Sequence, residues 1–472
     1  MVALTQNFIP LYIGGQRRAA SDNSTYDVFN PSNGQILAKV AAATADDCKA
    51  AVDSAAKAFE TWQHSTPGFR STIIRKAVDI ILSDKYKQRI IDTVVQETVG
   101  SHVGGMVDLP YKVKGDILPS DHGNHVFIKK RPMGVILNIS PWNAPLILAL
   151  STSLPALAAG NTVVLKTSES SPGSQSITAE ILKEAGLPDG VFNIIHTRRE
   201  DSGPRVAEII AHPQVRKLAF TGSDRIGRIL AAELAKHMKP GVFELGGKAP
   251  TIVLKDANID GAARAAVAGS MLHCGQLCVS TERVIVQKEV ADELISRIKT
   301  IASKITVGDP STTNAKLGPA FSTASAANIV GMIKDAVDAG AEVLVGDLTH
   351  NDAFIKPHVV LGAKPGDRLW DRETFGPVAD SVEHAIELAN ATTYSLASSL
   401  WTNDMRTAFD VASKVRAGKM IINGLPFGME SRFSQGGMGG SSGYGHFTID
   451  EFLDTQMVSF ENPNQPFVLV DF

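Results

Sequence analysis

The chain has 472 residues, with 46 lysines and arginines against 49 aspartates and glutamates, which leaves a formal charge of −3. This length predicts about two to four domains, and the balanced charge argues against a nucleic-acid binder or a polybasic membrane anchor. Three cysteines, Cys48, Cys274 and Cys278, cannot form a disulfide framework and indicate a reducing compartment. No transmembrane helix or secretory signal is recognisable, so we expect a cytoplasmic protein.

Helical and strand-like patterns alternate along the chain. Thr44 followed by Asp47 is typical of a helix cap, and apolar residues recur at helical spacing behind it and again around residue 78. The most apolar stretch, residues 144–160, is predicted to be a buried helix. Strands are predicted at residues 133–139, 162–165, 192–195, 218–220, 251–254, 283–286 and 341–345, and helices at residues 225–237, 292–305 and 326–339. This alternation predicts α/β domains with parallel sheets.

Three glycine-rich turns stand out. Residues 218–220 run into Thr221-Gly222-Ser223 and a helix, which offers N–H groups to a phosphate but lacks the G-x-G-x-x-G fingerprint, so a plain turn is favoured. Glu244 precedes a double-glycine turn and would be a general base if buried, although a solvated glutamate is favoured. Residues 435–445 hold six glycines and must form a loop, either a flexible surface turn or a close backbone approach.

Cys274 and Cys278 lie four residues apart without matching Cys or His pairs elsewhere, so no zinc site is predicted. A cysteine after a glycine and near a helix could have a lowered pKa and act as a nucleophile. Buried structural cysteines are nevertheless the favoured interpretation, and a dyad with His273 is a minor alternative. Asn143, between two prolines after a predicted strand, is either an oxyanion donor or a turn former.

In their joint occurrence and order these motifs resemble the aldehyde dehydrogenase superfamily, from about Asn30-Pro31 to the end of the chain. The segments that carry the resemblance are Pro141-Trp142-Asn143, Val164-Leu165-Lys166 with Glu169, Phe220-Thr221-Gly222-Ser223, Glu244-Leu245-Gly246-Gly247-Lys248, Gly275-Gln276-Leu277-Cys278 and Glu373-Thr374-Phe375-Gly376-Pro377. The resemblance implies an α/β fold with three parts. These are a Rossmann-type NAD-binding domain (1–120 and 132–246), an α/β catalytic domain (247–445) and a small β oligomerisation element (121–131 and 446–472). A homodimer or homotetramer is expected.

The resemblance also implies roles for individual residues. Cys278 would attack the aldehyde carbon, Asn143 would stabilise the oxyanion, and Glu244 would activate the water that hydrolyses the thioester. NAD is the expected hydride acceptor, because acidic Glu169 would repel a 2′-phosphate. NADP is the alternative, because Arg198 and Arg199 could pair with that phosphate. The implied cofactor-binding residues are Ser140, Pro141, Trp142, Lys166, Ser168, Glu169, Gly222, Ser223, Leu245, Gly246, Glu373 and Phe375; no metal is expected.

Residues 278–283 and 449–452 resemble the branch that includes salicylaldehyde, vanillin and benzaldehyde dehydrogenases, which implies oxidation of an aromatic aldehyde to its acid. A non-catalytic relative with a structural or binding role and an NADP-dependent semialdehyde dehydrogenase are the alternatives. The chain departs from the family at His273, at Ser434-Gln435 in a late loop, and at residues 101–113, where the family has a long helix. Loss of that helix is expected to widen the substrate entrance and expose apolar surface.

Overall fold

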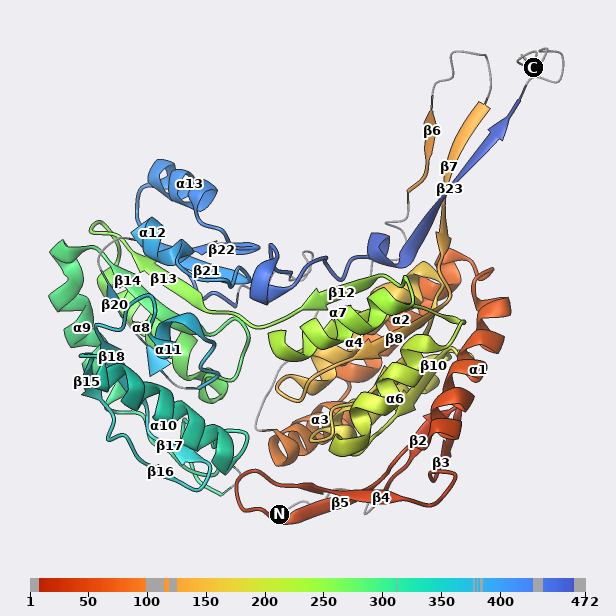
Figure 1. Cartoon of the computed structure of the whole chain (residues 1–472), viewed down its shortest axis with the longest axis horizontal. Coiled ribbons are helices and arrows are strands. Elements are labelled where there is room, and N and C mark those ends of the chain that lie inside the picture. The colour runs from red at the N-terminus through yellow and green to blue at the C-terminus, as the bar shows by residue number, and fades with distance from the viewer. Residues whose placement is uncertain are drawn as a thin grey trace.

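The fold is taken from a computed structural model that describes residues 8–98, 114–118, 125–310, 312–376, 378–379, 381–382, 385–427 and 436–461. Two of the departures predicted above, at residues 101–113 and at Ser434-Gln435, lie outside these residues. The described chain forms two α/β units that face each other and a third, all-β element that projects from the first unit (Figure 1).

The first unit is built on a seven-stranded sheet in the order β12-β11-β8-β9-β10-β2-β3. Its strands are β2 (Leu11–Ile13), β3 (Gln16–Arg18), β8 (Val135–Ile139), β9 (Thr162–Lys166), β10 (Phe192–Ile195), β11 (Val215–Thr221) and β12 (Gly241–Glu244). The five central strands are parallel, and β2 adds antiparallel to β10. A separate small sheet contains β1 (Phe8–Ile9), β4 (Thr25–Phe29) and β5 (Ile36–Ala41).

Helices cover both faces of the seven-stranded sheet. They are α1 (Ala45–Trp62), α2 (Pro67–Leu82), α3 (Asp84–Glu97), α4 (Pro145–Ala159), α5 (Pro172–Ala185), α6 (Arg199–Ala211) and α7 (Asp224–Lys236). Successive strand residues point to opposite faces, so Ile136 packs with α2, α4 and α5, whereas Leu137 packs with α1, α6 and α7. The predicted cap is confirmed, because the Thr44 side chain accepts from Asp47 N while the Asp47 side chain accepts from Thr44 N.

The second unit is built on a five-stranded parallel sheet in the order β20-β14-β13-β21-β22. Its strands are β13 (Ala249–Val253), β14 (Thr281–Val286), β20 (Ser381–Val382), β21 (Ala397–Trp401) and β22 (Lys419–Ile422). One face packs on α8 (Ile259–Met271) and α9 (Lys288–Ala302), and the other on α12 (Ala385–Asn390) and α13 (Met405–Lys414). Further elements are α10 (Thr323–Asp338), α11 (Arg368–Asp371), β15 (Glu342–Val345), β16 (His350–Asn351), β17 (Phe354–Ile355), β18 (His358–Leu361) and β19 (Val378–Ala379).

The projecting element is a three-stranded sheet in the order β23-β7-β6 (Figure 1). It consists of β6 (Asp116–Leu118), β7 (His125–Pro132) and β23 (Leu453–Phe460). Strands β7 and β23 pair antiparallel over their full length, from Leu453 opposite Pro132 to Phe460 opposite His125. This pairing joins residues 125–132 to residues 453–460, two segments that lie far apart in the sequence.

Three short 3-10 helices complete the described elements: η2 (Leu272–Gly275), η3 (Gly440–Ser442) and η4 (Ile449–Phe452). The glycine-rich loop approaches its neighbours closely, because side chains at Gly440 and Gly443 would collide with the carbonyl groups of Thr393 and Phe243. Of the two interpretations of this loop, the close backbone approach is thus confirmed for residues 436–445. No helix in the described part of the chain is long and apolar enough to span a membrane.

Candidate active site

Four of the sequence motifs lie at the carboxyl ends of neighbouring strands. Residues 140–143 follow β8, residues 166–169 end β9, residues 221–223 end β11, and residues 244–246 end β12. These strands are parallel neighbours in the order β12-β11-β8-β9. Their carboxyl ends therefore meet at one edge of the sheet, which is where open α/β sheets bind ligands.

The second unit contributes a loop with unusual backbone. After α8, His273, Cys274 and Gly275 have positive φ angles of 54°, 57° and 69°. Left-handed backbone is uncommon for residues other than glycine, and a side chain at Gly275 would collide with the carbonyl group of Gly376. Such conformations persist only where the surroundings hold them, and they cluster at functional sites.

This loop brings Cys278 against the end of β12. The Cys278 thiol donates a hydrogen bond to Glu244 Oε1, with a sulfur–oxygen distance of 3.2 Å. Glu244 is only 2% exposed, so the interpretation as a solvated glutamate is wrong. Cys274, at 1% exposed, is the structural core cysteine that the sequence favoured, whereas the sulfur of Cys278 faces a carboxyl group. A nucleophile and a base thus lie within hydrogen-bond distance.

Burial sets the protonation of this pair. It raises the pKa of Glu244 from 4.5 to about 7, and burial together with the negative charge of Glu244 raises the pKa of the Cys278 thiol well above 9. The hypothesis of a thiol with a lowered pKa is therefore wrong for this structure. The thiolate has to be generated by transfer of the thiol proton to a base, and Glu244 is the group placed to accept it.

Asn143 joins the pair through the nucleophile loop. Its Nδ2 donates to the backbone carbonyl of Gln276 at 2.9 Å, two residues before Cys278. An amide nitrogen carries two hydrogens, so the second N–H of Asn143 can donate to another acceptor. This hydrogen bond fixes the orientation of the Asn143 amide, which a residue that only forms a turn does not need. Both the donor and the turn interpretation were open from the sequence, and the contact across the two units favours the donor.

Gln276 is a positioning residue that the sequence motif contained but did not explain. Its side chain donates to the carbonyl groups of His273 and Pro319 and accepts from the backbone N–H of Phe321 at 2.6 Å. Phe321 in turn stacks on Trp142, with ring centroids 4.1 Å apart. The nucleophile loop, the segment before α10 and the segment after β8 are therefore tied together.

The turn after β11 fits a phosphate. Ser223 is the N-cap of α7, and its hydroxyl accepts from the backbone N–H of Ile226. Gly227 lets α7 approach Leu245 closely, because a side chain there would meet the Leu245 methyl groups at 2.7 Å. The helix N-terminus, with its partial positive charge, thus points to the edge of the sheet that carries the other motifs.

Lys166 and Glu169 form an ion pair at the end of β9. Although burial favours the neutral acid, the charge and hydrogen bond of Lys166 hold the pKa of Glu169 below its usual value, so the group is a carboxylate at neutral pH. Two other residues predicted to bind the cofactor make hydrogen bonds within the first unit. The Ser140 hydroxyl donates within its own unit, to Asn138 and the Leu148 carbonyl, and the Ser168 backbone N–H donates to Gln175.

Glu373 and Phe375 reach the site from a turn of the second unit. Gly247 N–H donates to Glu373 Oε1 at 2.9 Å, and a side chain at Gly246 would occupy the space of the Glu373 carboxyl group. Burial and the negative charge of Glu282 raise the pKa of Glu373 to about 8. The Phe375 ring lies edge-on to Trp142 with a centroid distance of 5.9 Å. These contacts place a carboxyl group and two aromatic rings together beside the double-glycine turn.

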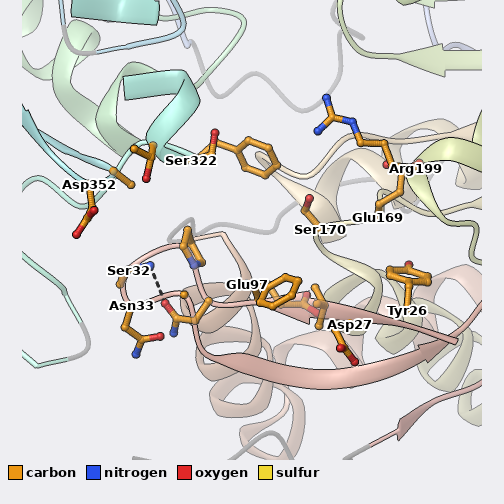
Figure 2. Close-up of a pocket in the computed structure, with 18 of the residues that line it drawn as sticks. Tyr26, Asp27, Ser32, Asn33, Glu97, Glu169, Ser170, Arg199, Ser322 and Asp352 are labelled. Atoms are coloured by element: carbon orange, nitrogen blue, oxygen red, sulfur yellow. Dashed lines mark hydrogen bonds between the residues drawn. The ribbon is translucent and has the colours of Figure 1, made fainter. Parts of the chain in front are cut away.

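A cavity of about 710 Å³ lies beside this edge (Figure 2). Glu169, Ser170 and Arg199 line one side of it, and Ser322 and Asp352 lie across from them (Figure 2). Cys278 and Glu244 do not line this cavity, so its size says nothing about the reacting centre. In the described residues no group of three or more His, Cys, Asp or Glu side chains is arranged to hold a metal ion.

Comparisons with known proteins agree with this geometry. Residues 18–459 match the model of the aldehyde dehydrogenase family. The chain is 35% identical to the vanillin dehydrogenase of Pseudomonas fluorescens over 96% of this chain and 98% of that protein. It is 34% identical to the benzaldehyde dehydrogenase (NAD(+)) of Pseudomonas putida, over 93% and 94%. A crystal structure of salicylaldehyde dehydrogenase from Pseudomonas putida G7 with salicylaldehyde superposes with a TM-score of 0.93, at 32% identity, over 98% of this chain and 100% of that one.

Proposed function

The chain belongs to the aldehyde dehydrogenase family and is an NAD(P)-dependent oxidoreductase, and on this premise we propose that it oxidises an aromatic aldehyde to the carboxylic acid with NAD. The observation that carries the proposal is the hydrogen bond between the Cys278 thiol and the buried carboxyl group of Glu244. The aromatic substrate is supported by the names of the relatives and by the apolar surroundings of Cys278, which include Leu277, Val279, Leu396 and Phe427.

The proposed reaction begins with transfer of the thiol proton to Glu244. The Cys278 sulfur then bonds to the aldehyde carbon, and the second N–H of Asn143 and the Cys278 backbone N–H stabilise the oxyanion. The bound nicotinamide supplies the hydride acceptor that no side chain can replace. Loss of the aldehyde hydrogen as hydride to this acceptor would leave a thioester on Cys278. Glu244 releases the first proton to solvent and then takes one from water, and the water oxygen bonds to the thioester carbon. The C–S bond breaks to release the acid, and Glu244 returns its proton to the Cys278 sulfur to restore the thiol.

The proposed cofactor site combines residues at the carboxyl ends of β9 and β11 with the turn that contains Glu373 and Phe375. Ser223 and the N-terminus of α7 would bind the pyrophosphate, the Lys166–Glu169 pair the adenosine ribose, and the turn with Glu373 and Phe375 the nicotinamide ribose. The close contact of Glu373 with the Gly246-Gly247 turn, which directly follows the end of β12, supports this placement. A reducing compartment such as the cytoplasm would keep the reactive thiol of Cys278 intact.

The choice of NAD over NADP is proposed to depend on Glu169. Its carboxylate would repel a 2′-phosphate, whereas Arg199 at the same cavity would attract it. We expect Glu169→Gln to raise the ratio of kcat/KM for NADP to that for NAD by about tenfold, because each 1.4 kcal/mol of removed repulsion is worth about that factor. Initial rates with both cofactors and one aldehyde measure this ratio.

Glu200→Gln is the matched control, because Glu200 lines the same cavity but has no ion pair with Lys166. An equal change of the ratio in both variants would show that the general field of the cavity, and not Glu169, sets the preference. Arg199→Ala should lower turnover with NADP below the wild-type value, because the charge that attracts the 2′-phosphate is lost, and should leave turnover with NAD unchanged.

The proposal on the substrate is tested by a direct assay. The purified full chain is given benzaldehyde, vanillin or salicylaldehyde, or an aliphatic aldehyde or semialdehyde, each with NAD or NADP, and the absorbance of the reduced nicotinamide is followed. We expect the highest kcat/KM for an aromatic aldehyde with NAD. A preference for semialdehydes with NADP would overturn the substrate assignment, and a folded protein without any turnover would make it a non-catalytic relative.

The β6-β7-β23 sheet is proposed to be an oligomerisation element. It projects away from both units (Figure 1) and exposes large apolar side chains, with Ile117 75%, Met457 65% and Phe460 65% exposed. Large apolar side chains exposed on both faces of one small sheet indicate that it contacts another surface. We expect light scattering to give a multiple of the 50.2 kDa chain mass and the double variant Met457→Glu, Phe460→Glu to lower it. A monomeric wild-type protein would contradict this proposal.

A further inference from the structure

Glu282 lies beneath the proposed cofactor site and has no role in the reaction described above. It sits on β14 and is 4% exposed. A carboxylate so deeply buried is costly unless charged and polar partners satisfy it. Glu282 has both charged and polar partners. Its Oε2 accepts from Lys248 Nζ at 2.5 Å, and its two oxygens accept from the backbone N–H groups of Thr374 and Phe375 at 2.9 to 3.0 Å.

Lys248 extends the same network. Its side chain is 1% exposed, and Nζ also donates to Thr374 Oγ1 at 2.9 Å. Lys248 directly follows the Gly246-Gly247 turn, whose Gly247 N–H donates to Glu373. The charged pair therefore connects the double-glycine turn, strand β14 and the turn at residues 373–375.

The turn at residues 373–375 needs such support. It lies after the end of α11, outside any helix or strand, and Phe375 has a φ of 51°. A bulky residue in this region of backbone space is strained and stays there only when its surroundings hold it in place. The hydrogen bonds that Thr374 and Phe375 donate to Glu282 hold this backbone in place. They thereby set the directions of the Glu373 and Phe375 side chains, which flank Thr374 in the turn.

Stability alone is a poor explanation of the ion pair. Apolar residues of similar volume often replace a buried salt bridge without loss of stability, because removing two charges from water is costly. What apolar residues cannot do is accept the N–H groups of Thr374 and Phe375. The specific gain from Glu282 is thus the position of this turn.

We propose that Glu282, paired with Lys248, is a positioning residue for the hydride-accepting end of the cofactor site. It holds the turn at residues 373–375 so that Glu373 and Phe375 stand where the nicotinamide ribose and ring bind. This inference rests on the proposed function, since it assigns that end of the cofactor to Glu373 and Phe375. Glu282 acts through the turn and touches neither the substrate nor the cofactor.

The variant Glu282→Gln tests the inference. Glutamine has the same shape, but its NH2 group would face a donor, either Lys248 or a backbone N–H. The turn then loses a hydrogen bond to a charged group, so we expect the dissociation constant for NADH to rise by about tenfold or more. Titration of protein fluorescence with NADH measures the affinity without turnover, and kcat is expected to fall as well.

A second readout separates positioning from general damage. Hydrolysis of 4-nitrophenyl acetate without cofactor uses Cys278, Asn143 and Glu244 but needs no nicotinamide, because the ester already has the oxidation level of the acid. We expect Glu282→Gln to retain this activity within about threefold while dehydrogenase activity falls. Asp256→Asn is the matched control. Asp256 lies beyond the other end of β13 and accepts from the backbone N–H groups of Asn403 and Asp404, so its loss should lower the melting temperature without changing NADH affinity.

Should Glu282→Gln fail to fold, the double variant Lys248→Met, Glu282→Met decides, because it leaves no unpaired charge. A folded variant of either kind with wild-type NADH affinity and kcat would overturn the inference, as would an equal loss of esterase and dehydrogenase activity. These outcomes presuppose an active wild type. A wild-type chain without any aldehyde turnover sinks the proposed function instead, so the two failures are distinguishable.

Discussion

Cys278→Ser is expected to abolish aldehyde oxidation, with kcat reduced by about 10⁴-fold or more, as when a covalent nucleophile is removed from other enzymes. The reason lies in the proton transfer that the structure requires. Glu244, with a pKa of about 7, can accept the proton of a thiol that lies 3.2 Å away, but a serine hydroxyl is a far weaker acid. Reduced-nicotinamide absorbance measures the loss, and NADH binding followed by fluorescence should remain at the wild-type value.

Cys274→Ala is the control from the same loop. Cys274 is buried, and burial raises the pKa of its thiol to about 12. The carboxyl group that can take a thiol proton, Glu244, is hydrogen-bonded to Cys278 instead. We expect this variant to keep most of its turnover and to lose some stability, because a buried sulfur is removed. If Cys278→Ser kept wild-type turnover while Cys274→Ala lost it, the nucleophile would have been assigned to the wrong cysteine.

Glu244→Gln is expected to stop the reaction after the first turnover. An amide cannot accept a proton from water, so hydrolysis of the thioester should slow by about 10²–10⁴-fold, the usual contribution of a general base. Stopped-flow absorbance should then show reduced nicotinamide rising slowly to about one equivalent per active site, because Glu244 also takes the thiol proton, followed by a still slower steady state. A burst as fast as that of the wild type would mean that another group takes the thiol proton. Rapid multiple turnover would exclude Glu244 as the base for hydrolysis.

The pH dependence checks the same assignment. Glu244 acts as a base in its carboxylate form, and its pKa in the folded protein is raised to about 7. Wild-type kcat should therefore rise with pH around pH 7, and this limb should be absent in Glu244→Gln. Stability has the opposite sign. Because the folded state holds this proton more tightly than the unfolded state, the contribution of Glu244 to stability is full below pH 4.5 and is lost as pH rises through 7. Glu244→Gln should thus gain melting temperature relative to the wild type at pH 8 but not at pH 4.

The elements that were predicted well from the sequence are those with a strong local pattern. The strand at residues 192–195 is reproduced as β10, and the helix at residues 144–160 is α4, ended by Gly160 with a φ of 99°. The edge strand β3 was not predicted, because all three of its residues are exposed and carry no apolar alternation. Its place in the sheet depends on pairing with β2, a contact that local propensity does not encode.

The candidate site divides in the same way. The order of the motifs was sufficient to identify the family and to single out Asn143, Glu244 and Cys278, because both assignments depend only on residue types and their spacing. The parts played by Gln276, Phe321 and Glu282 were missed. Each of them acts on a segment distant in the chain, as when Glu282 accepts from Phe375, and no spacing rule on one sequence points to such a partner.

The sequence by itself determined that this chain carries an aldehyde dehydrogenase site, which cysteine is the candidate nucleophile and that the fold is built from parallel α/β units. Only the tertiary structure decided how burial and neighbouring charges set the pKa values of Glu244 and Cys278. Taken alone, the residues favoured a solvated Glu244 and left a thiol of lowered pKa as one alternative for Cys278, and the burial of both groups contradicts these two interpretations. A pKa depends on the water and charges around a group. Glu244 at the end of β12 belongs to the first unit, whereas the nucleophile loop and the turn at Glu373 belong to the second. These groups are buried against one another only because the two units pack together.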